Sequence, residues 1–220
     1  VAAAPARRIG FALLLLLLIT LTPAAAQPGD GTPLFSGITY YREERTDPRP
    51  YTVHIVTVDL TAPGIGFAVT PGDPDAFYQL EAQTTSAFLA GQGVQVAINA
   101  NYFTKEDTGS LLDALYLAGQ PVRALGLAVA DGAAYAVDAP GLAFLAIGAD
   151  NDVRIDSLPP GVRHAVAGRY VILREGAVQP VRSGVDARTA VGLDAAGQTL
   201  ILVVVDGRRP DVSEGVTLPN

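Results

Sequence analysis

The sequence predicts an α+β fold built on a large mixed or antiparallel β-sheet with few helices. Short β-branched segments recur along the chain and outnumber the helical ones. Asp-Gly and Glu-Gly dipeptides, which favour tight hairpins, separate several of these segments. No βαβ repeat, P-loop or GxGxxG pattern is present. Because 49% of the residues are hydrophobic and 17% are charged, we expect a packed core.

The N-terminus has the three-part pattern of a secretory signal peptide. Arg7 and Arg8 precede the apolar run 11–21, and Ala24–Ala26 supplies small residues for cleavage. The run is shorter than the about 20 apolar residues that cross a membrane. An uncleaved anchor and a buried helix are the alternatives. We therefore expect three parts, with membrane contact only through the first: a signal peptide over 1–26, a Gly- and Pro-rich linker over 27–36, and one domain over 37–220.

The first half of the domain contains three segments with strand patterns and one with a helix pattern. Alternation of apolar and polar residues predicts a strand over Tyr51–Leu60, and a second strand over Ile65–Val69 follows the turn at Pro63-Gly64. Thr84 or Thr85 is expected to cap a helix that ends at Gly91. The apolar run Val94–Ile98 predicts a buried strand.

The second half reads as a series of short antiparallel strands joined by turns. Asp131-Gly132 and Glu175-Gly176 each lie between two β-rich segments, which is the strongest short-range signal for a hairpin. The pairs of segments expected to form hairpins are 125–130 with 133–137, 142–147 with 153–155, 169–173 with 177–181, and 189–193 with 199–205.

Composition excludes several classes of site. The chain has no Cys, which rules out a disulfide, a thiol nucleophile and a Cys-ligated metal. Its two histidines, His54 and His164, argue against a His-rich zinc site, and both are interpreted as packing residues. The net charge of −7 argues against a nucleic-acid partner. We expect no cofactor and no metal, and the oligomeric state is left open.

Polar residues gather where the predicted strands begin or end. Asn99 and Asn101 follow the run 94–98, and amide groups both donate and accept hydrogen bonds, as sugar hydroxyls require. Arg188-Thr189 precedes one strand of the last hairpin, and the guanidinium fork matches phosphate oxygens. Asp206-Gly207-Arg208-Arg209 and Ser213-Glu214-Gly215 follow the other strand. Asp206 and Glu214 could form the carboxylate pair that glycosidic acid–base chemistry uses.

Each of these residues also has a purely structural interpretation. Asn99 and Asn101 could be turn residues that tolerate a left-handed backbone, and Asp206-Gly207 is a common turn dipeptide. Arg208 with Arg209 could be a solvated charge pair, and Arg188 could be a surface ion-pair partner. The pattern of residues leaves both interpretations open.

Two longer segments carry a resemblance to a known family. VAINANYF ends at Phe103, and ARTAVGLDAAGQTLILVVVDGRRPDVSEGVTLP spans 187–219. With the strand Val53–Leu60 and Gly168, they resemble the phosphodiester glycosidase family, whose animal member is the lysosomal uncovering enzyme. That enzyme removes N-acetylglucosamine from a mannose phosphodiester. The resemblance implies a site with the following residues: Arg188, Asp206 and Glu214 as catalytic, and Asn99, Asn101, Phe103, Thr189, Gly207, Arg208, Ser213 and Gly215 as substrate-binding.

The sequence departs from the family pattern in two places. Ala100 and Tyr102 replace a glycine-type residue and a Phe of the first motif, which is a mild change. In the family the C-terminal segment opens a helix, and a strand ending in Asp-Gly-Gly-Gly-Ser follows it. This sequence stops at Asn220 without that motif. We therefore expect a C-terminally truncated chain that lacks full activity.

The resemblance and the polar strand ends together lead to one functional hypothesis. We expect an exported glycosidase that cleaves a sugar linked through its anomeric oxygen to phosphate, in exopolysaccharide or cell-envelope glycan metabolism. Arg188 with Arg208 would hold the phosphate, the Asn pair would hold sugar hydroxyls, and Asp206 or Glu214 would be the acid–base group. The alternatives are a non-catalytic envelope module that binds phosphorylated glycan, and a structural domain without a ligand.

Overall fold

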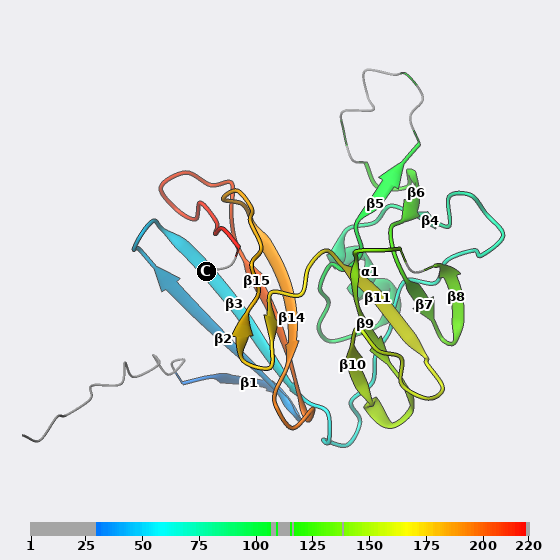
Figure 1. Ribbon diagram of the computed structural model, residues 1–220, viewed down its shortest axis with the longest axis horizontal. Coiled ribbons are helices and arrows are strands. Elements are labelled where there is room, and N and C mark those ends of the chain that lie inside the picture. The colour runs from blue at the N-terminus through cyan, green and yellow to red at the C-terminus, as the bar shows by residue number, and fades with distance from the viewer. Residues whose placement is uncertain (1–29, 107–108, 110–114, 116, 138, 219–220) are drawn as a thin grey trace, which may run out of the picture.

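The chain folds mainly into antiparallel β-structure (Figure 1). The computed structural model describes residues 30–106, 109, 115, 117–137 and 139–218. Within these residues every pair of strands is antiparallel, and one α-helix is present. The predicted signal peptide, residues 1–26, lies outside them. No helix in the described ranges is both long and apolar enough to cross a membrane.

The first sheet joins the beginning of the domain to its end. Its strand order is β1-β2-β3-β15-β14. The bounds are β1 Thr32–Phe35, β2 Ile38–Arg45, β3 Tyr51–Asp59, β14 Arg188–Leu193 and β15 Thr199–Val205. The predicted strands at 51–60 and 199–205 are confirmed. Four residues expected in the linker instead form the edge strand β1, because the turn at Ser36-Gly37 folds them back against β2.

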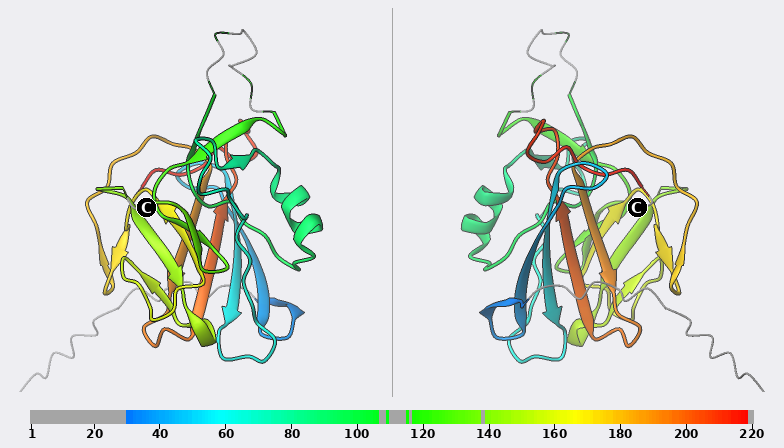
Figure 2. Two further views of the ribbon diagram at one scale, coloured as in Figure 1. Left: turned by 90° about the vertical axis from the view of Figure 1, so that its right-hand side faces the viewer. Right: turned by 90° about the vertical axis from the view of Figure 1, so that its left-hand side faces the viewer.

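A second five-stranded sheet faces the first (Figures 1 and 2). Its order is β10-β9-β11-β7-β8, with β7 Ala128–Ala130, β8 Ala133–Ala136, β9 Ala143–Ile147, β10 Val153–Ile155 and β11 His164–Gly168. The remaining strands form a three-stranded sheet, of order β4-β6-β5, and the hairpin β12-β13. Their bounds are β4 Leu80–Glu81, β5 Phe103–Lys105, β6 Pro121–Ala124, β12 Leu173–Arg174 and β13 Ala177–Val178. The sequence predicted one large sheet, and the structure instead has two five-stranded sheets that face each other. Each sheet has an apolar face, and another layer must cover it.

The two dipeptide turns form the predicted hairpins. Asp131 and Gly132 have φ of 46° and 83°, and they connect β7 to β8. Glu175 and Gly176 have φ of 50° and 78°, and they connect β12 to β13. Positive φ at both central residues is the backbone of the type I′ turn, whose twist matches that of the flanking strands.

The helix α1, Thr85–Gln92, starts as predicted and ends later than predicted. Thr84 caps it by accepting a hydrogen bond from Ala87 N, and it ends at Gly93 in the left-handed conformation rather than at Gly91. The predicted strands over 65–69 and 94–98 form no ladder in the described part of the chain. Ile65 and Phe67 instead pack against the core between the sheets, so their apolar character reflects burial and not strand pairing.

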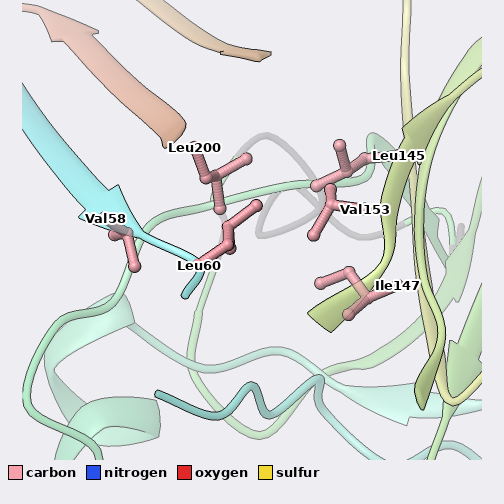
Figure 3. Packing of buried hydrophobic residues seen from close by; sticks show 6 residues of the cluster. All are labelled: Val58, Leu60, Leu145, Ile147, Val153 and Leu200. Atoms are coloured by element: carbon pink, nitrogen blue, oxygen red, sulfur yellow. The ribbon is translucent and has the colours of Figure 1, made fainter. Parts of the chain in front are cut away.

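The main core lies between the two five-stranded sheets. Val58, Leu60 and Leu200 from the first sheet meet Leu145, Ile147 and Val153 from the second (Figure 3). Leu200 is only 1% exposed. Removing this apolar surface from water is the principal stabilisation of such a two-layer arrangement. The face of β3 and β15 that carries Val58 and Leu200 is called the inner face below.

Candidate functional site

The inner face of the first sheet changes from apolar to polar along β3. In the ladder with β15, Val58 pairs with Leu200, Val56 with Leu202 and His54 with Val204. Residues two apart on a strand point to the same side, so His54 shares the inner face with Val56 and Val58. The core ends at the level of His54, and polar side chains continue the inner face beyond it.

Asp206 is the central carboxylate of this polar region. Its backbone N–H donates to Thr52 O at 3.0 Å, which extends the β15 ladder by one residue and keeps Asp206 on the inner face. Asp206 Oδ2 lies 3.5 Å from His54 Nε2 and 3.9 Å from Arg209 Nη1. The side chains of His54 and Asp206 are 32% and 35% exposed, so solvent and small molecules reach both.

Tyr40 orients the His54 ring. The Tyr40 hydroxyl lies 2.7 Å from His54 Nδ1, and the two rings are stacked with centroids 6.0 Å apart. Nδ1 is therefore occupied, and Nε2 is the nitrogen that faces Asp206. Sequence reasoning assigned His54 to packing and did not find this arrangement. The alternation in 51–60 placed His54 on the same side as Val56, but the pairing with β2 and β15 was needed to bring Tyr40 and Asp206 to it.

Thr189 and Asn99 lie at the margin of the same region. Thr189 pairs with Val204 in the β14–β15 ladder and so shares the inner face with Asp206. Its hydroxyl donates to Asn99 Oδ1 at 2.7 Å. Asn99 comes from the segment between α1 and β5, so this bond ties the first sheet to the other half of the molecule. The structure therefore brings Asn99 and Thr189, two of the residues named as substrate-binding, into contact.

The Asn101 side chain forms hydrogen bonds with backbone groups. Its Nδ2 donates to the carbonyls of Leu125 and Leu127, each at 3.1 Å, and its Oδ1 accepts from Ala167 N at 3.0 Å. Both amide hydrogens are used in these contacts. Asn101 thus fastens the segment before β5 to β11 and to the chain after β6, and the predicted role in sugar binding finds no support in its contacts.

The buried Ser213 side chain is hydrogen-bonded to the backbone of Asp206. It is 0% exposed, which removes it from direct contact with a substrate in this conformation. Its Oγ accepts from Thr52 N at 3.0 Å and donates to Asp206 O at 2.8 Å. The hydroxyl thus bridges the Thr52 N–H and the Asp206 carbonyl, which would bond directly to each other in a regular ladder. It fixes the backbone of the candidate catalytic residue.

Gly207 and Gly215 allow two backbone segments to touch. A Cβ at Gly207 would overlap the Ala187 backbone nitrogen, and a Cβ at Gly215 would overlap the Asp186 carbonyl. Gly215 also has φ of 100°, a conformation that side chains disfavour. These contacts explain the two glycines by packing, and they hold the C-terminal segment against the start of β14.

Arg188 lies on the other face of the sheet. It pairs with Val205, one step from the Thr189–Val204 pair, so alternation directs it away from Asp206. Its Nε donates to Val216 O at 3.4 Å, and its Nη2 donates to Gly184 O. Arg188 and Asp206, which were expected in one site, therefore point to opposite faces, because the strand period of two separates neighbouring ladder positions.

Arg208 is paired with Asp186, which the sequence analysis did not single out. Arg208 Nε lies 2.7 Å from Asp186 Oδ1, and Nη2 lies 3.2 Å from Oδ2. The hydrogen bond from Arg208, with smaller help from the Ala187 N–H and the charges of Arg208 and Arg188, lowers the pKa of Asp186. Both guanidinium groups that were expected to hold phosphate thus act on Asp186, Arg208 by a hydrogen bond and Arg188 by its charge.

The two remaining predicted residues have contacts different from those of Asp206. Glu214 has its carboxylate 3.9 Å from Arg49 Nε, and its N–H donates to Pro50 O at 2.8 Å. Asp206 and Glu214 therefore face different cations. Phe103 begins β5 in the three-stranded sheet, opposite Ala124, and is 41% exposed. Among the described residues no group of three or more Asp, Glu, His or Cys side chains has the arrangement of a metal site.

Comparison with a solved structure supports the fold. A crystal structure of a Burkholderia pseudomallei protein named "Putative exported protein" superposes with a TM-score of 0.52 at 14% identity. The match covers 77% of this chain and 64% of that protein, so the chain spans less than two thirds of its length. No curated protein matches the sequence.

Comparison with protein families covers the C-terminal part of the molecule. A family model described as phosphodiester glycosidase matches residues 92–220, which is more than half of the chain. The matched segment contains Asn99, Thr189, Asp206 and Arg209, and it begins after His54. The resemblance seen in the sequence is confirmed, and the chain belongs to the phosphodiester glycosidase family.

Proposed function

We propose that the protein is an exported hydrolase that cleaves the bond between a sugar's anomeric carbon and a phosphodiester oxygen, in exopolysaccharide or cell-envelope glycan. The family supports glycosidase chemistry. One observation carries the placement of the site: a partly exposed carboxylate, Asp206, lies beside His54 and Arg209 on the same face as Thr189. These groups combine proton transfer, anion binding and hydroxyl recognition in one polar region.

Asp206 acts as the acid–base group in this proposal. Water attacks the anomeric carbon, the bond from that carbon to the phosphate oxygen breaks, and its electron pair remains on the oxygen. The Asp206 carboxylate takes the proton that water releases. The products are a free sugar and a phosphomonoester. Phosphate is a good leaving group, so charge stabilisation contributes more than protonation at the departing oxygen.

Asn99 and Thr189 bind the sugar. The Thr189 hydroxyl donates to the Asn99 amide oxygen at 2.7 Å, which fixes the plane of that amide. A fixed amide recognises the direction of a hydroxyl group, and leaving such a polar site unpaired disfavours sugars that lack the hydroxyl. Arg188, Arg208, Asn101, Ser213 and the two glycines position the surrounding backbone through the contacts described above.

The proposal is tested with a synthetic sugar-1-phosphodiester and two matched variants. Asp206→Asn should lower kcat/KM by about a factor of 10² to 10⁴, the range typical of a lost general acid–base group. Asp131→Asn is the control, because Asp131 also lies near a histidine and an arginine and is 79% exposed. It should leave kcat/KM unchanged.

Two results would contradict this function. One is a folded wild-type protein that hydrolyses none of a panel of sugar-1-phosphodiesters. The other is equal activity of Asp206→Asn and wild type. Glycan binding without turnover would favour the non-catalytic envelope module over the hydrolase.

Export is the second part of the proposal. The basic, apolar and small-residue pattern of 1–26 and the name of the Burkholderia relative support it. Expression of the full chain in a bacterium, followed by cell fractionation and N-terminal sequencing, tests it. Recovery outside the cytoplasm with a new N-terminus near Gln27 is expected, and retention of the intact chain in the cytoplasm would contradict it.

A further inference from the structure

We propose that Arg209, together with His54, binds the phosphate group of the substrate, in place of Arg188 and Arg208. This inference rests on the proposed function and assigns the anion-binding residues of the same site. It departs from the expectation drawn from the sequence, in which Arg188 and Arg208 held the phosphate. The assignment follows from which donors the fold already occupies and which it leaves beside Asp206.

Arg188 and Arg208 already have hydrogen-bond partners within the protein. Arg208 makes two hydrogen bonds to Asp186, at 2.7 and 3.2 Å, and an anion would have to displace this bidentate pair. Arg188 donates to two backbone carbonyls that hold the loops around it. Among the described residues, the carboxylate that faces the Arg209 guanidinium is that of Asp206, at 3.9 Å, which is too long for a hydrogen bond. Its side chain is 62% exposed and can turn its fork to an incoming phosphate.

Arg188 and Arg209 also differ in their position relative to Asp206. Asp206, the acid–base group, is on the inner face, whereas the ladder puts Arg188 on the opposite face. An arginine near Asp206 can hold the phosphate of a substrate whose anomeric carbon lies within reach of the carboxylate. Arg209 meets this requirement by its contact with Asp206 Oδ2.

His54 supplies a second donor at the same carboxylate. Tyr40 occupies Nδ1 at 2.7 Å, and when the tyrosine donates that bond the ring proton lies on Nε2. Nε2 is 3.5 Å from Asp206 Oδ2, so the carboxylate engages it only weakly. The other charged groups near the ring are Arg42, directly opposite on β2, and Glu44, which is paired with Arg42. His54 Nε2 and Arg209 Nη1 thus lie near the same oxygen, Asp206 Oδ2, at 3.5 and 3.9 Å.

The experiment compares three arginine variants in the full chain. Arg209→Ala should raise KM for a sugar-1-phosphodiester about tenfold to a hundredfold, as expected for a lost charge-assisted contact, with a smaller change in kcat. Arg163→Ala is the matched control, because Arg163 is 63% exposed and also lies 3.9 Å from an aspartate. It should leave KM unchanged, and Arg209→Lys should recover part of the affinity.

A direct binding measurement separates this inference from the proposed function. Inorganic phosphate is titrated into wild type, Arg209→Ala, Arg208→Ala and His54→Gln, and binding is followed by calorimetry. We expect Arg209→Ala to abolish phosphate binding and His54→Gln, which keeps a side-chain N–H donor, to retain most of it. Phosphate binding that depends on Arg209 in a protein without turnover would support the inference and refute the hydrolase.

Three results would overturn the inference. They are an unchanged KM in Arg209→Ala, a loss of phosphate binding in Arg208→Ala but not in Arg209→Ala, and a wild-type protein that does not bind phosphate. Turnover by wild type together with any of them would leave the proposed hydrolase standing without this assignment.

Discussion

In the described part of the chain, one aspartate, one histidine and one arginine come together in two places, and these two clusters differ in how exposed their side chains are. In the first, Asp206 lies 3.5 Å from His54 and 3.9 Å from Arg209. In the second, Asp131 lies 3.7 Å from His164 and 3.9 Å from Arg163. The residue types and the distances are nearly the same, so neither distinguishes a candidate active site from a structural contact.

Exposure distinguishes the two clusters. The side chains of Asp206 and His54 are each about a third exposed, and both lie on the polar end of the inner face. Asp131 is 79% exposed on a hairpin turn, whereas the His164 side chain is 6% exposed. His164 Nδ1 accepts from Asp131 N at 3.3 Å, so this ring fixes the turn between β7 and β8. A reactive group needs both shielding and access, and only the first cluster has both.

The largest expected effect contrasts the two histidines. His164→Ala should lower the free energy of unfolding by about 2 kcal/mol or more, because it removes a buried ring and a partner of a turn N–H. His54→Ala removes a half-exposed ring and should lower it by about 1 kcal/mol. Urea titrations of both variants measure the difference. A greater loss of stability in His54→Ala would reverse the roles of the two clusters.

The next effect concerns the support of Asp206. Ser213→Ala leaves Thr52 N–H and Asp206 C=O without their shared partner, and it should cost about 1 to 3 kcal/mol of stability. Activity should fall as well, since the Asp206 backbone loses its anchor. Ser157→Ala, at an exposed position, is the control for removing a serine hydroxyl. Equal unfolding midpoints for the two variants would show that the buried hydroxyl is not needed.

A smaller effect is expected at the link between the two halves of the molecule. Thr189→Val removes the bond to Asn99 and should lower kcat/KM for the sugar phosphodiester by about tenfold or less, near the value of one neutral hydrogen bond. Thr189→Ser keeps the hydroxyl and should behave like wild type. Steady-state kinetics measures both. An inactive serine variant would point to the methyl group instead of the hydrogen bond.

The smallest effect is a pH dependence of stability that comes from His164 in the second cluster. Burial lowers the pKa of His164, a shift that nearby Arg163 reinforces and Asp131 opposes. The unfolded chain therefore binds the proton more tightly, so stability falls as pH drops from the ordinary histidine pKa of about 6.5 toward the lower folded value. His164→Gln should flatten the stability curve in this window. Urea midpoints between pH 7 and 5 test this, and parallel curves for variant and wild type would contradict it.

Local sequence signals located the hairpins and the helix start. Asp131-Gly132 and Glu175-Gly176 specify their turns through positive φ, and Thr84 specifies the first turn of α1 through its side chain. The apolar runs 65–69 and 94–98 were wrong as strands. Apolar composition reports that a segment is covered, and a ladder additionally needs a partner strand at the right place.

The candidate site was found in part. Asn99, Thr189 and Asp206 were singled out because polar residues gather where the predicted strands begin or end, and the structure places Thr189 and Asp206 on one face. Tyr40 and His54 were not found, since both look like ordinary strand residues until β2 and β3 are paired. Arg188 was expected in the same site as Asp206 but lies on the other face of the sheet, because a one-residue difference in ladder position reverses the direction of a side chain.

The sequence alone determined the family, the predominance of short strands over helices and the residue types of the site, because these depend on motifs and on near neighbours in the chain. The tertiary structure decided which face each strand residue occupies and which arginine is already paired. Those properties depend on registers such as His54 with Val204 and on contacts such as Arg208 with Asp186, which join residues far apart in the chain. Such pairings are set by the packing of the two sheets as a whole, and no local pattern encodes them.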